Sequence, residues 1–434
     1  MANNQSKNKK QKSNTQQKSG KKFDQKKNTR TNYDQKMKNR KATEKRKNKE
    51  HKGLLIGITM MLIGAFFLVT AAILKKSADK NKTGYNTPNG AVNADRDEYN
   101  AYNFGMGTSL SVTVYGKMNS ETTVSLAEEE AGAIFDAVKY LDNDVITWRY
   151  EGSALYGLNY GGVLSPDSKS DELLYDVIRK SLEICNNSEG ALDITIRPIL
   201  NAWQIETYDQ PWEDYLPPDD ETLLRAKKLT GTDKIKLTDD GITLDGTIID
   251  LGSVGKGYVL DYVANMVLKE FSETKGIKER SIVFSAGGSV LVYGTGNLKR
   301  KFKIGIRDPK GTMADMVGYL EFPSDCGKVC VSTSGNYEKY IEKDGVRYHH
   351  IIDPSTMKPA DNGLASVTVV CGSDSVDPEY AGLISDGLST ACFVLGEEKS
   401  RELLKKYNAE AVFIDEYGEI SVTDGLKDSF KKNE

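Results

Sequence analysis

The sequence predicts an α+β fold, in which one folded domain follows a single N-terminal transmembrane helix. Several short segments alternate apolar and polar residues or are rich in β-branched residues, as strands are, and others repeat apolar residues every three to four positions, as helices do. The strands follow one another without regular alternation with helices, which is typical of α+β proteins. The predicted strands are residues 110–116, 281–286, 289–294, 302–308, 366–372, 411–415 and 420–423, and the predicted helices lie at 173–181, 257–271 and 378–396.

Residues 1–52 form a basic tail that cannot bury a hydrophobic core. They contain 19 Lys and Arg residues against four Asp and Glu residues. Residues 53–434 instead hold 40 basic and 58 acidic residues. Because an acidic body repels phosphate backbones, this distribution argues against nucleic acid as the main ligand. We expect the tail to be disordered and cytoplasmic, with anionic membrane lipid as its partner.

Residues 53–74 are predicted to form a transmembrane helix, since they contain no charged residue. At about 1.5 Å per residue this segment spans the ~30 Å hydrocarbon layer. A buried core helix rarely lacks every charge over such a length. A cleaved signal peptide usually has a shorter apolar region that ends at small residues, whereas Lys75 and Lys76 follow here. Basic residues are concentrated on the N-terminal side, which places residues 75–434 outside the plasma membrane.

The rest of the chain is interpreted as a flexible linker followed by one folded domain. Residues 75–98 are polar and rich in Asn, Gly and Lys, as flexible linkers are, and residues 99–427 show no internal repeat or second linker. Five cysteines are an odd and sparse set, so no disulfide framework is evident. Cys326 and Cys330 could pair or bind a metal, and their redox state stays open.

The predicted helix at 378–396 carries a carboxylate and a hydroxyl on one face. Asp386 and Thr390 are four residues apart, so their side-chain oxygens lie on the same side of the helix. Hard oxygen ligands suit Mg²⁺, which takes few protein ligands and completes its shell with water and phosphate. The alternative interpretation is an ordinary solvated helix face.

A glycine-rich turn at 248–261 leads from a strand-like segment into a helix. Its glycines surround Lys256 and would let the backbone approach a ligand closely, and a helix N-terminus with a lysine favours phosphate. The spacing matches neither a Walker loop nor a dinucleotide-binding fingerprint. A generic glycine turn is the alternative.

Two of the three histidines of the chain, His349 and His350, stand just before the segment IIDP. A histidine at the end of a strand can act as a base, or it can be a buried structural residue. The Ser/Thr-rich segment at 331–340 is interpreted as a turn that could hold a ligand through hydroxyls and backbone amides.

Eight segments between residues 103 and 396 resemble, in the same order, the ApbE family of FAD:protein FMN transferases. Each is weak alone, but eight in family order are improbable by chance. The matching segments are residues 104–116, 191–203, 249–261, 284–294, 303–309, 331–340, 350–359 and 385–396.

This resemblance implies a compact α+β, T-fold-like domain that binds FAD in a cleft and transfers FMN to a Thr or Ser of a partner protein, releasing AMP. It also implies roles for individual residues. Mg²⁺, or Mn²⁺, would be held by Asp386, Thr390 and the backbone carbonyl of Ser253. FAD would lie against Met106, Asp193 and Lys256, and His350 would be catalytic. Two positions depart from the family pattern, Gly255 and Ser289, and neither removes a metal ligand.

The resemblance further implies acceptors with a Ser/Thr-Gly-Ala-Thr type motif. These would be exported or membrane flavoproteins, such as subunits of Rnf-type or sodium-translocating NADH:quinone reductase complexes. Two other functions remain open on the same residues. One is a Mg²⁺-dependent FAD pyrophosphatase that yields FMN and AMP, and the other is a non-catalytic flavin-binding surface protein.

Overall fold

The computed structural model describes residues 86–87, 90–93, 97–277, 279, 281–296 and 300–433. The predicted tail at 1–52 and the predicted transmembrane helix at 53–74 lie outside these residues. Within the described ranges, every helix is too short or too polar to cross a bilayer.

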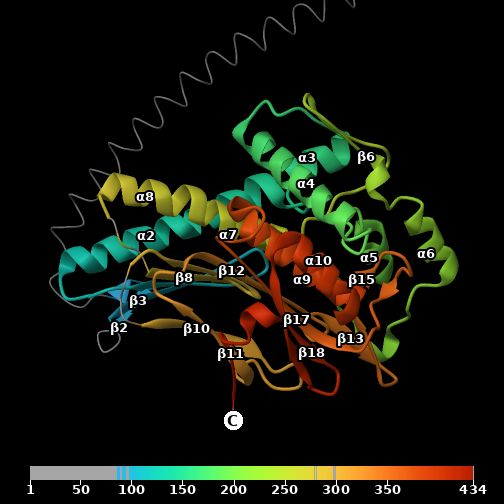
Figure 1. Cartoon of the computed structure of the whole chain (residues 1–434). Helices are drawn as coiled ribbons and strands as arrows, with labels where there is room; N and C mark the ends of the chain where they lie inside the picture. The colour runs from blue at the N-terminus through green and yellow to red at the C-terminus, as the bar shows by residue number, and fades with distance from the viewer. Residues whose placement is uncertain are drawn as a thin grey trace, which may run out of the picture. The chain divides into compact units, whose positions relative to one another are not determined.

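A ten-stranded antiparallel sheet forms the centre of the described domain (Figure 1). Its long central strands pair over most of their length, for example β12 with β17 from Val329↔Gly372 to Gly335↔Ser366. In spatial order its strands are β1 (Asn86–Thr87), β2 (Gly90–Asn93), β3 (Glu98–Gly105), β4 (Thr108–Tyr115), β8 (Ser281–Ala286), β9 (Ser289–Gly294), β12 (Gly327–Gly335), β17 (Leu364–Gly372), β18 (Glu410–Asp415) and β19 (Ile420–Val422).

Four smaller sheets complete the β structure of the described residues. The first packs under the large sheet and consists of β10 (Lys301–Arg307), β11 (Met316–Pro323) and β20 (Phe430–Lys432). The others are β5 (Val163–Leu164) with β7 (Gly241–Leu244) and β6 (Ile235–Thr238), β13 (Tyr340–Lys343) with β14 (Val346–His349), and β15 (Ile352–Asp353) with β16 (Lys358–Pro359).

Helices cover the opposite face of the large sheet, where α9 packs on β12 and β17 and α2 packs on β3 (Figure 1). The α-helices are α2 (Glu121–Tyr140), α3 (Ala154–Gly161), α4 (Lys169–Asn187), α5 (Arg197–Trp203), α6 (Asp220–Lys227), α7 (Gly255–Tyr262), α8 (Leu268–Lys275), α9 (Ala381–Leu395) and α10 (Glu397–Tyr407). Short π-helical and 3₁₀ turns are η2 (Leu141–Ile146), η3 (Trp212–Asp214), η4 (Thr232–Lys234), η5 (Val263–Val267), η6 (Pro378–Tyr380) and η7 (Asp424–Leu426).

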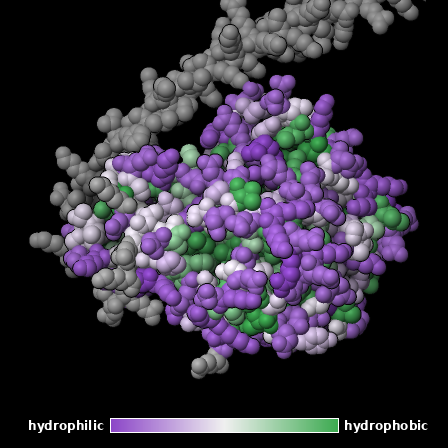
Figure 2. All heavy atoms as spheres, in the orientation of Figure 1, coloured by the Kyte–Doolittle hydropathy of each residue, from purple (hydrophilic) through white to green (hydrophobic). Residues whose placement is uncertain are grey.

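The large sheet has an apolar core on each face. Successive residues of a strand point to opposite faces. On β9, Leu291 joins the core under the helices, whereas Val292 joins the core against the small sheet. The visible surface is mostly hydrophilic, with hydrophobic residues in small separate patches (Figure 2).

The predicted α+β class is observed. The domain has three layers, in which helices cover one face of the large sheet and a small sheet covers the other.

Several predicted elements are observed and some differ. Strands 281–286 and 289–294 have the predicted bounds. The helix predicted at 257–271 is divided into α7, the π-helical turn η5 and α8. Strand β2 lies within the segment interpreted as a linker, and β20 lies beyond residue 427, so the ordered sheets extend past both predicted domain limits.

The segment at 331–340 is not a turn throughout, because its first half belongs to the central strand β12. Its serines resemble loop residues in the sequence, but they are paired under α9. Ser332 Oγ lies 2.9 Å from Ser385 Oγ, and Ser334 Oγ lies 2.8 Å from Ser389 Oγ. Hydroxyl pairs of this kind satisfy polar groups at a buried strand-helix contact.

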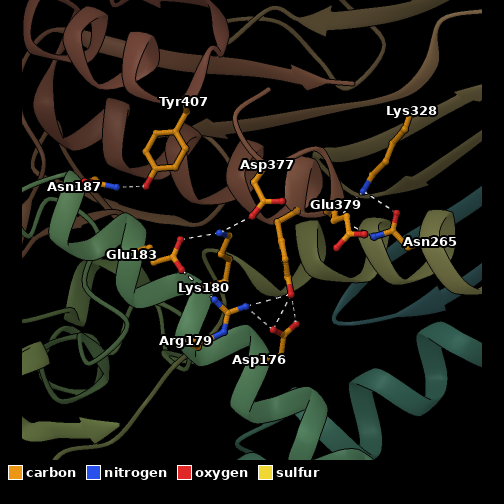
Figure 3. Close-up of polar contacts among 11 residues, drawn as sticks. Asp176, Arg179, Lys180, Glu183, Asn187, Asn265, Lys328, Asp377, Glu379 and Tyr407 are labelled. Atoms are coloured by element: carbon orange, nitrogen blue, oxygen red, sulfur yellow. Dashed lines mark hydrogen bonds and ion pairs between the residues drawn. The ribbon is translucent and has the colours of Figure 1, made fainter. Parts of the chain in front are cut away.

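Polar side chains join α4 to η6, the short helix that precedes α9 (Figure 3). Lys180 Nζ lies 2.7 Å from the Asp377 carboxylate, and the Tyr380 hydroxyl donates to Asp176 at 2.7 Å. These contacts hold the beginning of α9 against the helical layer.

The N-terminus of α9 is also anchored by a buried carboxylate on α7. Asp261 accepts hydrogen bonds from the amides of Gly382 and Leu383 at 2.7 Å each, and lies 2.7 Å from Lys328 Nζ. Burial raises the pKa of Asp261 to about 6 against the opposing effect of Lys328, so the ion pair is formed at neutral pH.

Replacing Asp261 with asparagine should lower the free energy of unfolding by about 3 kcal/mol, because the Lys328 side chain, which is 11% exposed, would lose its counter-charge. Urea denaturation followed by circular dichroism measures this loss. The control is Glu221→Gln, which removes a carboxylate that is 80% exposed and pairs with Arg225 within α6. That variant should change stability by less than about 1 kcal/mol. Equal losses in the two variants would contradict a special role for the buried pair.

Candidate active site

A cavity of about 460 Å³ lies above the end of the large sheet, between α9, the glycine-rich turn and the loop that follows β14. This volume falls in the range of small-molecule sites. All seven residues predicted for the site line it: Met106, Asp193, Ser253, Lys256, His350, Asp386 and Thr390. The fold therefore brings together residues that are up to 284 positions apart in the sequence.

A second hollow, of about 490 Å³, lies between α3 and the start of α4. Acidic residues and serines line it, including Asp144, Ser153 and Asp171. None of the predicted site residues belongs to it. The cavity beside α9 is therefore the candidate active site.

Asp386 is a buried carboxylate on the inner side of α9, with 3% of its surface exposed. Its Oδ2 accepts a hydrogen bond from the amide of Gly257 at 2.9 Å, and its Oδ1 accepts one from Ser289 Oγ at 3.1 Å. Lys256 Nζ lies 3.6 Å from Oδ1. The alternative interpretation of a solvated helix face is wrong for Asp386, because this side of α9 is packed inside the domain.

Thr390 is half-buried one turn further along α9. Its Oγ1 lies 3.1 Å from Ser334 Oγ at the end of β12. Asp386 and Thr390 both reach the cavity, as does the glycine-rich turn that contains Ser253.

The oxygen atoms offered by Asp386, Thr390 and the Ser253 carbonyl suit a hard cation. Such a set provides one negative charge and leaves positions for water and phosphate, as Mg²⁺ prefers. The described residues contain no group of three or more His, Cys, Asp or Glu side chains that could hold a metal. Because the predicted set includes only one such side chain, it would depend on the phosphates of a substrate for tight binding.

The glycines of the turn at 248–261 have different roles. A Cβ on Gly257 would lie 2.1 Å from the carbonyl oxygen of Gly382, and a Cβ on Gly382 would lie 2.3 Å from that of Gly257. These two glycines therefore let α7 and α9 cross in direct backbone contact. Gly252 and Gly255 line the cavity, and a Cβ on Gly255 would lie 3.2 Å from Ile146 Cδ1 and 3.8 Å from Met106 Cε. The expectation that the glycines serve a ligand does not hold for Gly257.

Met106 occupies the tight turn between β3 and β4 with a positive φ of 52°. This left-handed conformation is uncommon for a residue with a side chain. The amide of Met106 donates a hydrogen bond to Asp142 Oδ2 at 2.7 Å, from the π-helical turn η2. Asp142 thus holds the turn in place and directs the methionine to the cavity.

Asp193 stabilises its own loop at the cavity wall. Its Oδ1 accepts hydrogen bonds from the amide of Thr195 at 2.8 Å and from the Thr195 hydroxyl at 2.5 Å. The Thr195 hydroxyl in turn accepts from the amide of Gly231 at 2.6 Å. Because only Oδ1 is used in these bonds, Oδ2 is the oxygen of Asp193 that could serve a ligand.

The two adjacent histidines have different surroundings. His349 is buried, its Nε2 lies 3.0 Å from the carbonyl oxygen of Ala360, and its ring packs edge-on against Phe393. His350 lines the cavity, and its Nδ1 lies 3.2 Å from the carbonyl oxygen of Lys339. Since a carbonyl only accepts, Nδ1 of His350 carries the proton and Nε2 is left as the basic atom. His349 is therefore structural, and His350 is the histidine available for chemistry.

A chain of charged residues was not predicted as part of the site. Arg197 Nη1 lies 3.0 Å from both Glu206 and Asp250, and Lys339 Nζ lies 2.8 Å from Glu206. The Arg197 guanidinium also stacks on Trp148 at 3.8 Å from the ring centre. Arg197 and Asp250 fall within segments quoted for the resemblance, but no spacing in the sequence indicates that Arg197 pairs with both Asp250 and Glu206.

Burial and nearby charges shift the pKa of Glu206 and the pKa of His350. Burial alone would raise the pKa of Glu206, but Lys339 and Arg197 lower it to about 2. Burial, together with Lys339, holds the pKa of His350 below its usual value, although Glu206 opposes this shift. At neutral pH, Glu206 is therefore ionised and His350 is a neutral base.

Comparisons with known proteins agree with this geometry. The sequence profile of the ApbE family matches residues 106–413, a range that contains every predicted site residue. The chain is 28% identical over 320 residues to an FAD:protein FMN transferase of Klebsiella pneumoniae, covering 72% of this chain and 83% of the relative. It is 30% identical over 290 residues to an FAD:protein FMN transferase of Vibrio cholerae, covering 66% and 78%. The solved structure of the ApbE protein of Thermotoga maritima matches with a TM-score of 0.62 at 27% identity, covering 78% of this chain and 100% of that chain.

Proposed function

The chain belongs to the ApbE family, and from this membership we propose that it is an FAD:protein FMN transferase. The observation that carries the proposal is the single cavity at which all seven predicted residues meet, including a buried carboxylate and a neutral histidine. Such a cavity can position a pyrophosphate and an attacking hydroxyl, which is most of what phosphoryl-group transfer requires of a protein.

In the proposed reaction, the hydroxyl oxygen of a Ser or Thr on the acceptor protein forms a bond to the phosphorus of the FMN half of FAD. The bond from that phosphorus to the bridging oxygen breaks, and AMP leaves with this oxygen. His350 Nε2 removes the hydroxyl proton, since its Nδ1 is already bonded to Lys339.

The residues around α9 would bind the pyrophosphate. Lys256, in the first turn of α7, adds a positive charge at a helix N-terminus, where phosphates bind well. We propose that Asp386, Thr390 and the carbonyl of Ser253 hold Mg²⁺, which when bound would neutralise charge on the pyrophosphate. Met106 and Asp193, which line the same cavity, would contact the flavin nucleotide.

The test uses the full-length chain with FAD and Mg²⁺, with and without an exported flavoprotein that carries a Ser/Thr-Gly-Ala-Thr motif. AMP release and flavin fluorescence on a denaturing gel are measured together. Fluorescent acceptor formed in step with AMP supports transfer. Formation of AMP and free FMN without labelling would identify an FAD pyrophosphatase instead, and absence of both products would indicate a flavin-binding protein.

The pH dependence of transfer should reflect the lowered pKa of His350. Because the neutral form is the base, kcat/KM should be constant from pH 8 down to the usual histidine pKa of 6.5 and fall only at lower pH. Because burial and Lys339 lower the pKa of His350 to about 4, initial rates of acceptor labelling from about pH 3 to about pH 8.5 measure this fall.

Two variants should shift the pH at which kcat/KM falls, in opposite directions. Lys339→Met removes a charge that lowers the pKa of His350, so the fall should begin at higher pH. Glu206→Gln removes a charge that raises it, so the fall should begin at lower pH. If kcat/KM falls at the same pH in both variants and in the wild type, a group other than His350 controls the pH dependence.

We also propose that residues 53–74 anchor the chain in the plasma membrane with the catalytic domain outside. The support is the charge asymmetry around the uncharged segment. Acceptors would then be exported or membrane flavoproteins, such as subunits of Rnf-type or sodium-translocating NADH:quinone reductase complexes. Protease added to intact cells should digest the domain but leave residues 1–52, and protection of the domain would refute this topology.

A further inference from the structure

Strand β3 extends beyond its outer neighbour β2. The last residue pair between them is Gly90↔Ala101, whereas β3 continues to pair with β4 as far as Gly105↔Thr108. Within the described part of the chain, no strand pairs with Tyr102–Gly105 on the side away from β4. This segment, the β3 extension, is therefore an open strand edge of four residues.

The β3 extension displays two large aromatic side chains. Tyr102 is 61% exposed and Phe104 is 71% exposed. Residues two apart on a strand point to the same face, so both rings stand on one side of the edge. A single exposed aromatic is ordinary, but two beside an unpaired edge form a surface suited to a partner.

The backbone of the β3 extension is also available for pairing. The amide of Phe104 donates to the side chain of Asn103, with Oδ1 at 2.8 Å, and both residues are exposed. A carbonyl of an added strand could replace this local side-chain bond. Natural proteins usually protect open edges with charge or proline, and Tyr102–Gly105 contains neither.

The β3 extension leads directly into the candidate active site. The turn that follows it contributes Met106, Gly107 and Thr108 to the cavity lining. A strand added in line with β2 would run along Tyr102–Gly105 for about 13 Å and end beside Met106. Its next residues would then be at the cavity.

We propose that the acceptor protein docks on the β3 extension as an added β-strand, which carries its Ser or Thr to the cavity. The proposal rests on the proposed function, because only transfer to a protein requires a polypeptide to reach this site. Main-chain hydrogen bonds provide binding that tolerates different acceptor sequences, and the two rings add contacts to alternate side chains. One enzyme could in this way label several flavoproteins.

The test compares Phe104→Pro with Phe104→Ala in the full-length chain, with an exported flavoprotein that carries the Ser/Thr-Gly-Ala-Thr motif as acceptor. Proline removes both the edge amide and the ring, whereas alanine removes only the ring. We expect the acceptor KM to rise on the order of tenfold for proline and less for alanine. The Kd for FAD and the kcat at saturating acceptor should stay unchanged.

The matched control is Tyr417→Ala, which removes an aromatic that is 86% exposed at the turn between β18 and β19, near the other edge of the sheet. It should leave the acceptor KM unchanged. If Phe104→Pro fails to fold, Tyr102→Lys keeps the backbone and places a charge at the edge. That variant should also raise the acceptor KM.

Hydrogen exchange of the amides of Tyr102 and Phe104, which point away from β4, gives an independent readout. Acceptor should protect these amides in the wild-type chain. Protection already present without acceptor would show that a segment of this chain, or a second copy if it grows with concentration, occupies the edge, and either result overturns the proposal. Wild-type transfer with an unchanged KM in every variant also overturns it, whereas absence of labelling by the wild type would instead refute the proposed function.

Discussion

Asp386→Ala should abolish FMN transfer, with a loss on the order of 10³-fold or more in kcat/KM. The carboxylate is the one negatively charged group in the predicted metal site, and removal of several kcal/mol of charge stabilisation corresponds to a factor of this size. Labelling of the acceptor and release of AMP should fall together, because both depend on the same step. The measurement is the initial rate at several Mg²⁺ concentrations.

A structural effect must be separated from the loss of a metal ligand. Asp386 accepts hydrogen bonds from Gly257 and Ser289, so its removal also leaves two donors unpaired. Ser289→Ala removes one of these bonds and keeps the carboxylate. This control should lower the thermal midpoint slightly and retain transfer. Normal turnover by Asp386→Ala in Mg²⁺ would refute the assignment of the metal ligand.

His350→Ala should retain FAD binding and slow transfer by about 10²–10⁴-fold, the usual contribution of a general base. Because the imidazole acts on the acceptor hydroxyl, kcat should fall while the Kd for FAD stays near the wild-type value. Fluorescence titration measures binding, and single-turnover labelling of the acceptor measures the chemical step.

The neighbouring histidine is a suitable control. His349→Gln changes a buried side chain that contacts Ala360 and Phe393 but does not line the cavity. It should lower stability and preserve the transfer rate of the folded fraction. Equal loss of transfer in both variants would mean that His350 acts only through the structure of the loop.

Local pattern predicted much of the large sheet and the main binding helix. Strands β8 and β9 have strong β-branched alternation, and α9 has clear terminal signals in Pro378 and Gly396. Helix α2 was not predicted, because alanines such as Ala127 and Ala131 make up much of its apolar face and give weak periodicity. Strand β12 looked like a loop, because its serines pair with serine and threonine hydroxyls of α9 that are 53 or more residues away.

The candidate site was predictable only where a residue lay in a segment with a recognisable pattern. Asp386, Lys256 and His350 lie in such segments, and the structure places them at one cavity. Glu206 was missed, since its role depends on Arg197 and Lys339, and the Lys339 contact spans 133 positions. The role of Gly257 was also missed, because only the crossing of two helices shows why a side chain is excluded there.

The backbone contact between α7 and α9 fixes the position of the helix that carries Lys256 relative to the helix that carries Asp386. Because Gly257 lies against Gly382, and Asp261 bonds to the first amides of α9, a shift of one helix relative to the other would break these contacts. Directed evolution of this enzyme toward another nucleotide would therefore have to keep the crossing of the two helices intact. It could resize the pocket instead through side chains on the connecting loops, such as Met106 and Asp193.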